Sequence, residues 1–514
     1  MKPEEIIQKI EEKLYLIKTS PTELISFGIV ESIGDEIVKA SGLLNVGYYE
    51  KVIFDEGSIG LVINIDEDYV SIILLKIIKH ITCGMKVKAT GEVLSINVSN
   101  DLLGRVLNPL GQAIDGKILQ QNQALCYPID RLAPNITQRS AIDTPLKTGI
   151  KAIDIMTPIG RGQRELIIGD RGTGKTAIAI DTIINQQQDI RNNKNVICIY
   201  CSIGQKQSSL ASIVAKLIEH GALKYTIIVA ATASDHISMQ YIAPLVACAI
   251  GEYFMDKGDD ALVVYDDLIK HAWAYRQISL LIRRPSGREA YPGDIFYLHS
   301  KLLERSAKLS EKKGGGTLTA LPIVETQEND LSAYIPTNII SITDGQIYLE
   351  TDLFNAGIRP AINVGLSVSR VGSSAQTKSM KQLAAPIRLE LSQFRELQAF
   401  TQLGNDLDKN TLKILQRGEK IIEILKQSQY KPYDEVSEIL SIFSVTSGLF
   451  DDIDISILNK VEQQLICFFK QEQTLIIEKL LTIKEIDKNL QRELQDTIVH
   501  FKKLNNYGTK SSAN

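Results

Sequence analysis

The clearest chemical pattern in the chain is a glycine-rich segment over residues 169–176 that ends in Lys-Thr and matches G-x-x-x-x-G-K-[ST]. Glycines let backbone N–H groups turn toward a phosphate chain, where larger side chains would obstruct them. Lys175 supplies a positive charge for the β and γ phosphates, and Thr176 supplies a hydroxyl for Mg²⁺. The competing interpretation is an ordinary glycine-rich turn before a helix. We predict that ATP or ADP binds to Gly169, Asp170, Arg171, Gly172, Thr173, Gly174, Lys175 and Thr176.

A second candidate is the acid at the end of a later apolar run. Residues 261–265 are apolar, and Asp266 and Asp267 follow directly. Beside a phosphate loop, an acid at the end of a neighbouring strand can hold Mg²⁺ through its water shell. Apolar runs that end in aspartate are common, so this prediction depends on the loop upstream. We predict that Mg²⁺ is held by Thr176 and, through water, by Asp266.

The segments around these residues are suited to hold them. Residues 165–168 form an apolar run before the loop, and residues 177–185 have the composition of a helix that begins on it. Further apolar runs alternate with helical patterns, at 196–201, 208–220, 226–230 and 261–265. Alternating strands and helices indicate a parallel sheet covered on both faces. We predict a multidomain α/β protein in which residues 93–374 form this central domain.

The two ends of the chain have other patterns. Apolar residues at helical spacing among many charges predict an N-terminal helix or arm over residues 1–23. Short β-branched runs separated by turn residues predict a small β-barrel over residues 24–92. Residues 375–505 repeat the i, i+3, i+4 apolar spacing of a helical bundle, and residues 506–514 are small and polar like a tail. We expect the bundle's helices at 382–403, 408–426, 433–446, 454–474 and 483–503.

The composition limits the classes of function. A chain of 514 residues, with 44% hydrophobic and 23% charged residues, is typical of a soluble protein with several domains. Its formal net charge of −4 is too small to recruit nucleic acid or anionic lipid. The sequence begins without a basic region followed by an apolar stretch, so we expect no secretory signal. Its apolar runs are shorter than the roughly 18 residues of a membrane span, so membrane contact would require another subunit.

The six cysteines are scattered without a disulfide framework, which favours a reducing compartment. Cys198 and Cys201 form a C-x-x-C pair inside an apolar run. Because this run lacks a second cysteine pair and nearby histidines, we interpret it as a buried strand. The alternative is a redox or zinc site.

Longer segments are more specific than either motif. They lie at residues 158–165, 283–294, 341–346, 357–360 and 367–372. Together with the loop they resemble the alpha subunits of F-type ATP synthases, and the similarity runs from about residue 25 to about residue 450. The resemblance implies a β-barrel crown, a RecA-like P-loop domain and a C-terminal helical domain. It also implies a function in a complex that couples transmembrane ion (proton) flow to ATP synthesis.

The same resemblance implies the partners and the location. Three alpha and three beta subunits would alternate in a ring around a central-stalk gamma subunit, and a delta subunit would belong to the peripheral stalk. Membrane contact would occur only through the ion-translocating sector. The chain would then be a peripheral membrane protein on the cytoplasmic face of a bacterial inner membrane, or on the equivalent organellar face.

The turn at residues 202–206 bears on the kind of site that the chain has. In the beta subunits of this family a glutamate occupies the matching turn, and a carboxylate suits the task of polarising the attacking water. Gln205 takes that place here. Since a glutamine cannot accept a proton at neutral pH, we predict a site that binds Mg-ATP and turns it over slowly or not at all. The alternative is that Gln205 is only a loop residue.

Arg370 is the residue that the resemblance assigns to catalysis. The matching arginine reaches the neighbouring beta site as an arginine finger, where its planar charged fork stabilises charge on the transferring phosphoryl oxygens. Ser341 and Ser367 match alpha residues that line or support the same boundary. Without the resemblance, an arginine with a solvated head is the simpler interpretation.

The adenine end of the site is also carried over from the family. Amide side chains and a proline face are suitable neighbours for a base, and the alternative is an exposed helix end. The residues are Arg359, Pro360, Gln427 and Gln429. Three places depart from the family pattern: Gly172 replaces the glutamine of most alpha subunits, Gln207 replaces an arginine, and Glu-Asn-Asp at 328–330 replaces Ala-Gly-Asp.

Two other functions remain open. A self-sufficient hexameric ring ATPase of the Rho or flagellar-export kind would share the core fold but would need a carboxylate at position 205. A degenerate scaffold paralogue is the second, and the change at Gly172 leaves room for it. A basic stretch could suggest RNA, but it has no interleaved aromatic platform, so we expect no nucleic-acid partner. Its arginines are Arg276, Arg283, Arg284 and Arg288.

Overall fold

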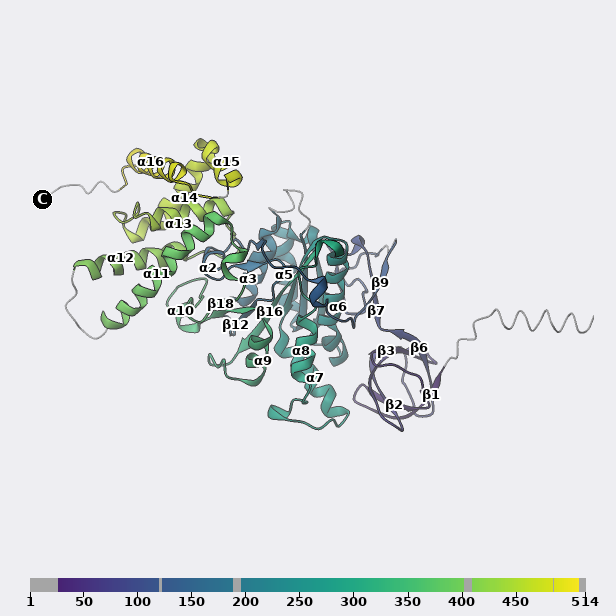
Figure 1. The fold of residues 1–514 in the computed structure, drawn as a ribbon. Helices are drawn as coiled ribbons and strands as arrows, with labels where there is room; N and C mark the ends of the chain where they lie inside the picture. The colour runs from purple at the N-terminus through teal and green to yellow at the C-terminus, as the bar shows by residue number, and fades with distance from the viewer. Residues whose placement is uncertain (1–25, 120–122, 188–195, 402–408, 484, 508–514) are drawn as a thin grey trace, which may run out of the picture. The chain divides into compact units, whose positions relative to one another are not determined.

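The structure is a computed structural model that describes residues 26–507, apart from 120–122, 188–195, 402–408 and 484 (Figure 1). The described chain divides into two compact units, Met1–Ser95 and Ile96–Asn514. The helix predicted over residues 1–23 lies outside the described residues, as does the part of the predicted tail at 508–514.

Described residues of the first unit form a closed antiparallel barrel with the strand order β1-β2-β5-β4-β3-β6. Burial alternates along β3, as expected for a strand with one face inside a barrel. Val38, Val52, Phe54 and Ile72 fill the interior. The predicted β-barrel is therefore confirmed. Its strands are β1 (Phe27–Gly34), β2 (Ile37–Ser41), β3 (Glu50–Phe54), β4 (Ile59–Ile65), β5 (Val70–Lys76) and β6 (Lys86–Val93).

The second unit is built on an eight-stranded sheet, counted over its described residues, with the order β18-β17-β12-β16-β15-β13-β14-β8. All neighbours in it are parallel except β17 and β18, which pair antiparallel at one edge. The predicted parallel sheet is thus confirmed, with one antiparallel edge strand. Its strands are β8 (Val106–Leu107), β12 (Leu166–Asp170), β13 (Val196–Gln205), β14 (Thr226–Thr232), β15 (Asp260–Asp266), β16 (Thr317–Thr326), β17 (Gly345–Leu349) and β18 (Val368–Ser369).

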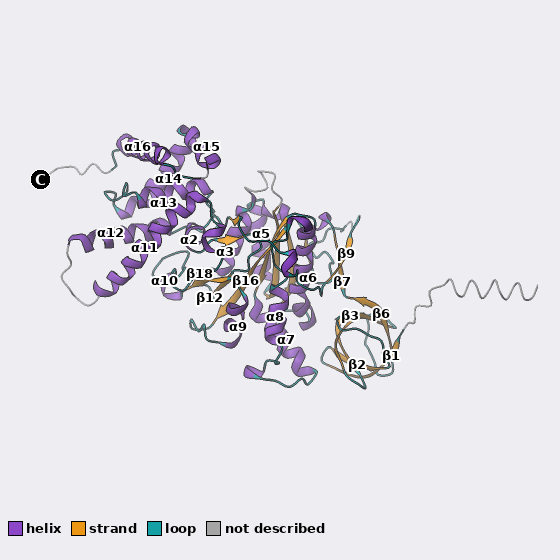
Figure 2. Cartoon of the chain, viewed as in Figure 1, coloured by secondary structure: helices purple, strands orange, loops and turns teal. Residues whose placement is uncertain are grey.

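Helices cover both faces of this sheet (Figure 2). The crossovers from β12 to β13 and from β13 to β14 run in one direction along the sheet, and those from β14 to β15 and β16 return. Right-handed crossovers therefore place α3 and α5 on one face and α6 and α7 on the other. The helices are α2 (Lys151–Met156), α3 (Lys175–Asn185), α5 (Gln207–Glu219), α6 (Ile237–Asp256), α7 (Leu268–Leu281), α8 (Ile295–Leu303), α9 (Tyr334–Ile342) and α10 (Thr351–Asn355). Short strands outside this sheet are β7 (Ser95–Val98), β9 (Leu125–Pro128), β10 (Pro145–Leu146) and β11 (Ile159–Gly160).

Helix α6 is a long apolar helix that packs against the sheet. Among the described helices it alone is long and apolar enough to cross a membrane, but 89% of its most apolar window is buried. It contacts β13, β14 and β15, so its apolar surface is part of the core.

After residue 376 the described chain is helical, which confirms the predicted C-terminal helical domain. One prediction was wrong: the helix expected at 483–503 begins at Lys488, and a separate helix, α15, precedes it. Asp487 accepts a hydrogen bond from the N–H of Leu490 (2.7 Å), and this N-cap sets the start of α16. The helices are α11 (Lys378–Thr401), α12 (Lys409–Leu425), α13 (Glu435–Thr446), α14 (Ile455–Glu472), α15 (Thr474–Ile483) and α16 (Lys488–Leu504).

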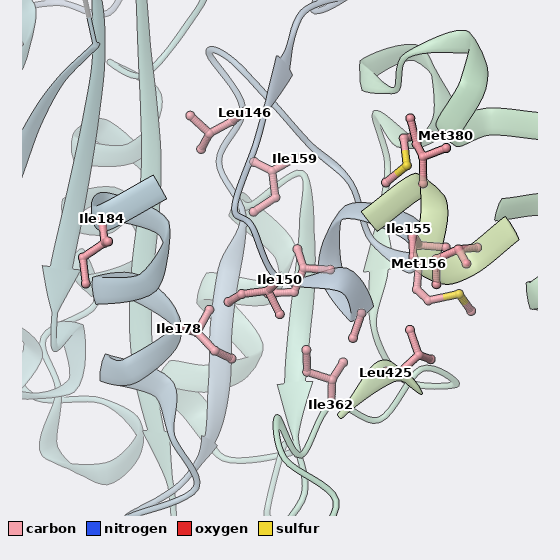
Figure 3. Packing of buried hydrophobic residues seen from close by; sticks show 14 of the residues in the cluster. Leu146, Ile150, Ile155, Met156, Ile159, Ile178, Ile184, Ile362, Met380 and Leu425 are labelled. Carbon is pink, nitrogen blue, oxygen red and sulfur yellow. The ribbon is translucent and has the colours of Figure 1, made fainter. Parts of the chain in front are cut away.

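One hydrophobic core joins this helical domain to the sheet. Figure 3 shows Ile178 of α3, Ile155 of α2, Ile150 directly before α2, Met380 of α11 and Leu425 at the end of α12 within the same cluster. All five side chains are less than a tenth exposed. The helical domain is therefore fixed beside the helix that follows the phosphate loop.

Candidate nucleotide-binding site

The phosphate loop (residues 169–176) runs from the end of β12 into α3, so strand, loop and helix follow each other as predicted. Gly172 and Gly174 have φ values of 81° and 102°, in the left-handed region that glycine tolerates without strain. Lys175 is the first residue of α3. The unpaired N–H groups of the helix's first turn therefore border the loop, where they can bind an anion.

Lys175 is held inside this loop. Its ammonium donates hydrogen bonds to the carbonyl oxygens of Gly169 (2.8 Å) and Asp170 (2.5 Å), and the residue is 7% exposed. Burial lowers the pKa of Lys175, while the charges of Glu325, Asp266 and other nearby carboxylates act in the opposite direction. A phosphate chain bound in the loop would satisfy this buried charge.

The side chain of Asp170 points away from the inside of the loop to neighbouring strand ends. Its carboxylate accepts hydrogen bonds from the hydroxyls of Thr326 (2.6 Å) and Thr351 (3.2 Å) and from the N–H of Asn329 (2.9 Å), so it ties the loop to the ends of β16 and β17. Burial alone would raise the pKa of Asp170, but these hydrogen bonds and the charge of Lys175 lower it. Within the loop, the Asp170 side chain is therefore an anchor rather than a phosphate contact.

The departure from Ala-Gly-Asp at residues 328–330 is explained by the same contact. Asn329 has a φ of 58°, in the left-handed region, where its backbone N–H meets Asp170. Asparagine visits this region more readily than most residues with a side chain. It can therefore replace the family's glycine and keep the conformation.

The two residues predicted to hold Mg²⁺ are in direct contact. The hydroxyl of Thr176 donates to Asp266 Oδ2 (2.8 Å), which leaves the lone pairs of the hydroxyl available to a metal ion. Hydroxyl and carboxylate oxygens suit Mg²⁺. The described residues contain no group of three or more His, Cys, Asp or Glu side chains that could hold a metal. The pair therefore fits Mg²⁺ that takes its remaining ligands from nucleotide phosphates and water.

Two further donors meet the same carboxylate. Tyr200 of β13 donates its hydroxyl to Asp266 Oδ2 (2.6 Å), and Gln205, at the end of β13, donates its amide to Asp266 Oδ1 (3.0 Å). Burial, together with the charge of Asp266, raises the pKa of Tyr200 well above its ordinary value, so the phenol stays a donor. Tyr200 was not among the site residues predicted from the sequence. The signal was a tyrosine in an apolar strand, whose buried hydroxyl needs a partner.

Asp267 has a structural role in the described chain. Its carboxylate caps α7 by accepting the N–H of Lys270 (2.9 Å), and the ammonium of Lys270 lies 3.1 Å away. Burial raises the pKa of Asp267, and Lys270 partly offsets this. Of the two adjacent acids, only Asp266 faces Thr176.

A cavity lies beside the loop, and the predicted adenine residues are part of its lining. Arg359 lies over the ring of Phe354, 4.3 Å from its centroid. The amide of Gln427 donates to the carbonyls of Gly149 (2.7 Å) and Lys431 (3.0 Å), so it holds the wall rather than offering free donors. The lining residues are Ile150, Thr173, Gly174, Ala177, Ile178, Asp181, Phe354, Arg359, Pro360, Ala361, Gln427, Ser428 and Gln429.

Asp181 of α3 is a second site residue that was not predicted from the sequence. It lines this cavity, and its Oδ1 accepts the N–H of Tyr430 (2.7 Å) from the segment after α12. Burial raises the pKa of Asp181 from 3.8 to about 7, although the hydrogen bond from Tyr430 opposes the rise. An acid inside a helix after the loop gave no signal, because its partner lies far along the chain.

Arg370, Ser341 and Ser367 lie apart from this cavity, around the β17–β18 edge of the sheet. The structure leaves Arg370 exposed, directly after β18. Ser341 is exposed and donates to the carbonyl of Asn338 (2.6 Å). Ser367 is buried: it accepts the N–H of Tyr348 (3.0 Å) and donates to the carbonyl of Asn363 (2.6 Å), so its hydroxyl supports the turn before β18.

The basic stretch and the C-x-x-C pair, which could have indicated other functions, are both accounted for within the chain. Arg276 lies 4.6 Å from the centroid of the Tyr291 ring, and Arg284 donates to the hydroxyl of Tyr275 (3.0 Å). Cys198 and Cys201 are fully buried in β13, and burial raises the pKa of both thiols. Both observations favour the structural interpretation of these segments.

Known proteins share this organisation along nearly the whole chain. The nucleotide-binding domain of the ATP synthase alpha/beta family matches residues 149–369, its beta-barrel domain matches 26–91, and its C-terminal domain matches 376–501. ATP synthase subunit alpha of Dehalococcoides mccartyi strain BAV1 is 51% identical over 485 residues, which are 94% of this chain and 95% of the relative. The subunit alpha of Caldanaerobacter subterraneus subsp. tengcongensis is 53% identical over 98% of both chains. ATP synthase subunit alpha 1 of Nitrosospira multiformis is 50% identical over 99% of this chain and all of the relative. The chain therefore belongs to the ATP synthase alpha/beta family, and these relatives place it among the alpha subunits.

Proposed function

We propose that the chain is a non-catalytic, regulatory ATP-binding subunit in the head of a rotary ATP synthase, and that it supplies Arg370 to a neighbouring catalytic site. The non-catalytic role is supported by one observation: the amide of Gln205 donates a hydrogen bond to Asp266 Oδ1 (3.0 Å). A carboxylate is needed near this position to polarise the attacking water, and the neutral amide instead donates its proton to the metal-site acid.

The residues of the pocket suit retention of nucleotide. Lys175 would bind phosphate oxygens, and Thr176 and Asp266 would hold Mg²⁺, which supplies charge neutralisation to the phosphates when it is bound. Tyr200 and Gln205 fix the orientation of Asp266. The base would occupy the cavity bordered by Pro360 and Gln429.

The second part rests on the exposed β17–β18 edge. Arg370 is outside the cavity of its own chain and is exposed. A guanidinium in this position can act on phosphoryl oxygens that a second subunit presents to it, and an arginine supplied in this way accelerates phosphoryl transfer by about 10³ to 10⁵. The relatives are ATP synthase subunits, which agrees with such a shared site.

The remaining parts of the proposal follow the family. The chain would alternate with beta subunits around a central-stalk gamma subunit and contact a peripheral-stalk delta subunit. The complex would couple proton or other ion flow to ATP synthesis and would contact the membrane through its ion-translocating sector. The head would lie on the cytoplasmic face of a bacterial inner membrane or the equivalent organellar face.

The first experiment uses the purified chain alone. We expect it to bind Mg-ATP without turning it over, and we expect hydrolysis to appear when beta subunits are added to form the ring. Equilibrium binding of ATP and phosphate release measure the two properties. Turnover by the isolated chain at a rate near that of the ring would reject the proposal and favour a self-sufficient ring ATPase.

The second experiment tests the contribution to the neighbouring site. The ring is assembled from beta subunits and the chain with Arg370→Ala, and kcat for ATP hydrolysis is measured. We expect a loss of about 10³ or more with the ring still assembled. An unchanged kcat would favour a scaffold role.

A further inference from the structure

The position of Arg370 depends on a short antiparallel pairing. Gly345 of β17 is in register with Ser369 of β18, and the N–H of Arg370 donates to the carbonyl of Asp344 (2.7 Å). The carboxylate of Asp344 is held on both oxygens by the guanidinium of Arg164 (2.9 and 2.8 Å). The backbone at Arg370 is therefore fixed from the β17 side.

The neighbouring residue, Ser369, is held from the opposite side of the pairing. Its hydroxyl donates to the carbonyl of Pro158 (2.7 Å) and accepts the N–H of Gly372 (3.1 Å) and the amide of Gln163 (3.1 Å). Three hydrogen bonds leave this hydroxyl little freedom. Gln163 is thus a buried side chain that contacts β18 beside Arg370.

Gln163 is itself fixed at both ends. It is fully buried, its Oε1 accepts the N–H of Gly160 (2.8 Å), and its Nε2 donates to Glu165 Oε2 (2.7 Å) as well as to Ser369. An amide can be reversed in such a site unless its partners distinguish oxygen from nitrogen. Gly160 as donor and Glu165 as acceptor make that distinction, so they direct the N–H groups toward Ser369.

Glu165 is an unusual residue to find in this place. It is fully buried at the start of β12, and its Oε1 has no hydrogen-bond partner among the described residues. Burial raises the pKa of Glu165 well above its ordinary value, Asp344 adds to the rise, and the Gln163 hydrogen bond and the charge of Arg370 oppose it. A buried carboxyl with an unused oxygen is costly to retain, which points to a function beyond stability.

The glycine at position 345 keeps this carboxyl beside the Arg370 strand. A Cβ at Gly345 would lie 2.1 Å from the carbonyl oxygen of Val368 and 2.7 and 2.9 Å from the two oxygens of Glu165. Such distances are far shorter than normal contacts, so only glycine allows β17, β18 and Glu165 to approach each other as they do.

We propose that Glu165 and Gln163 are positioning residues for Arg370. Gln163 acts through Ser369, and Glu165 acts through the orientation of the Gln163 amide. This inference rests on the proposed transfer of Arg370 to a neighbouring site. It adds that the residues which align the arginine lie inside this chain, at the strand that leads into its own phosphate loop.

The test is a double-mutant cycle in the reconstituted ring. Glu165→Gln replaces the carboxyl with an amide of the same size, which can present an N–H group instead of an oxygen to Gln163 and so release the orientation of its amide. We expect it to lower kcat for ATP hydrolysis about tenfold with KM within about twofold, because the arginine acts on the transition state. With Arg370→Ala present, Glu165→Gln should cause no further loss. Glu438→Gln is the matched control, since Glu438 is a buried glutamate with an unpartnered Oε1 in α13, and it should leave kcat unchanged in both backgrounds.

The outcomes separate the inference from the function on which it rests. If Arg370→Ala lowers kcat but Glu165→Gln does not, or if Glu165→Gln lowers it equally in both backgrounds, the positioning role is rejected and the proposed function stands. If Arg370→Ala leaves kcat unchanged, the proposed function fails and the inference fails with it. Ser369→Ala is the second variant should Glu165→Gln fail to fold. If Ser369→Ala lowers kcat several-fold, but not when Arg370→Ala is also present, the result would support positioning of Arg370 through Ser369.

Discussion

The phosphate loop and the β17–β18 edge belong to one sheet, but their charged groups are held in opposite ways. In the loop, the ammonium of Lys175 is buried and bound by backbone carbonyls, and Asp266 accepts from three side chains. At the edge, the backbone of Arg370 is tightly fixed while its side chain is exposed. The charged groups of the loop find their partners within this chain. The side chain of Arg370 is exposed and can interact with the surface of a second subunit.

Because of this difference, substitutions in the two regions should affect different functions. Residues of the loop contact one another, so their loss should act on the nucleotide that this chain binds. Arg370 lies outside that cavity, so its loss should act elsewhere. Variants in the two regions can therefore test whether the regions are independent.

The largest expected effects come from a crossed pair of variants in the reconstituted ring. Lys175→Ala should weaken ATP binding to this chain about 100-fold, because it removes charge-assisted bonds to phosphate, and should leave the initial rate of hydrolysis within about threefold. Arg370→Ala should do the reverse, with a loss of kcat of about 10³ and unchanged ATP binding to the isolated chain. Binding to the isolated chain and initial phosphate release from the ring measure both. Equal effects of either variant on both properties would remove the distinction between the regions.

On the pocket side of this comparison, Asp181 should make the stability of the chain depend on pH. The pKa of Asp181 is about 7 in the fold against 3.8 ordinarily, so the folded chain binds a proton that the unfolded chain has released between about pH 4 and pH 7. The contribution of Asp181 to the free energy of unfolding therefore falls as the pH rises through this window. Asp181→Asn should be more stable than the parent by about 2 kcal/mol at pH 8, and the gain should shrink toward pH 4.

Asp170→Asn is the matched control for that measurement, since the pKa of Asp170 is shifted down rather than up. Its carboxylate stabilises the fold above its ordinary pKa, so the variant should lose stability at pH 8, and the loss should diminish as the pH falls. Denaturant unfolding of the chain at several pH values gives both slopes. The same slope for the two variants would contradict the assignment.

Gln205→Glu tests the hydrogen bond to Asp266 at the predicted metal site. It replaces the donor to Asp266 with a second carboxylate at about 3 Å, so one of the two acids must bind a proton. We expect the free energy of unfolding to fall by about 1 kcal/mol at pH 8 and to recover toward pH 5. The isolated chain should still fail to hydrolyse ATP, because no second subunit supplies an arginine. Phosphate release well above that of the parent would show that the glutamine alone prevents turnover.

The smallest effects distinguish the two serines of the edge. Ser367→Ala leaves the N–H of Tyr348 without its acceptor and should lower the free energy of unfolding by about 1 to 2 kcal/mol. Ser341 is exposed and contacts only a carbonyl of its own turn among the described residues, so Ser341→Ala should change stability by less than about 0.5 kcal/mol. Thermal or denaturant unfolding separates them. Any loss of ring activity in Ser341→Ala would then reflect the boundary with another subunit.

Sequence patterns predicted well where neighbouring residues determine the structure. The loop from Gly169 to Thr176, its strand and its helix are contiguous, and their glycine and apolar spacing was sufficient. The small β-barrel was also predicted, because turn residues bound each of its short β-branched runs. The limit of α16 was missed, since Asp487 acts as a cap only through its contact with Leu490.

What the sequence did not predict depends on contacts between distant segments. Tyr200 meets Asp266 across two strands, and Asp181 meets Tyr430 from the end of α12. Asp170 belongs to the loop predicted to bind nucleotide, and the contacts of its carboxylate with Thr326 and Asn329 at another strand end were not predicted. The roles of Gln205 and Arg370 came from family resemblance, because their own types and spacing allowed simpler interpretations.

The cavity beside the phosphate loop has a consequence for the chain as it is synthesised. Part of its lining comes from α3, and another part comes from Gln427, Ser428 and Gln429 after α12. These two parts are far apart in the sequence: Asp181 and Tyr430, which are hydrogen-bonded, are separated by 249 positions. During translation the loop therefore exists long before the base has anywhere to bind. A ribosome-bound chain would acquire the complete binding site only once the segment after α12 had emerged and packed against α3. Nucleotide binding by the nascent chain would therefore indicate that this packing had occurred.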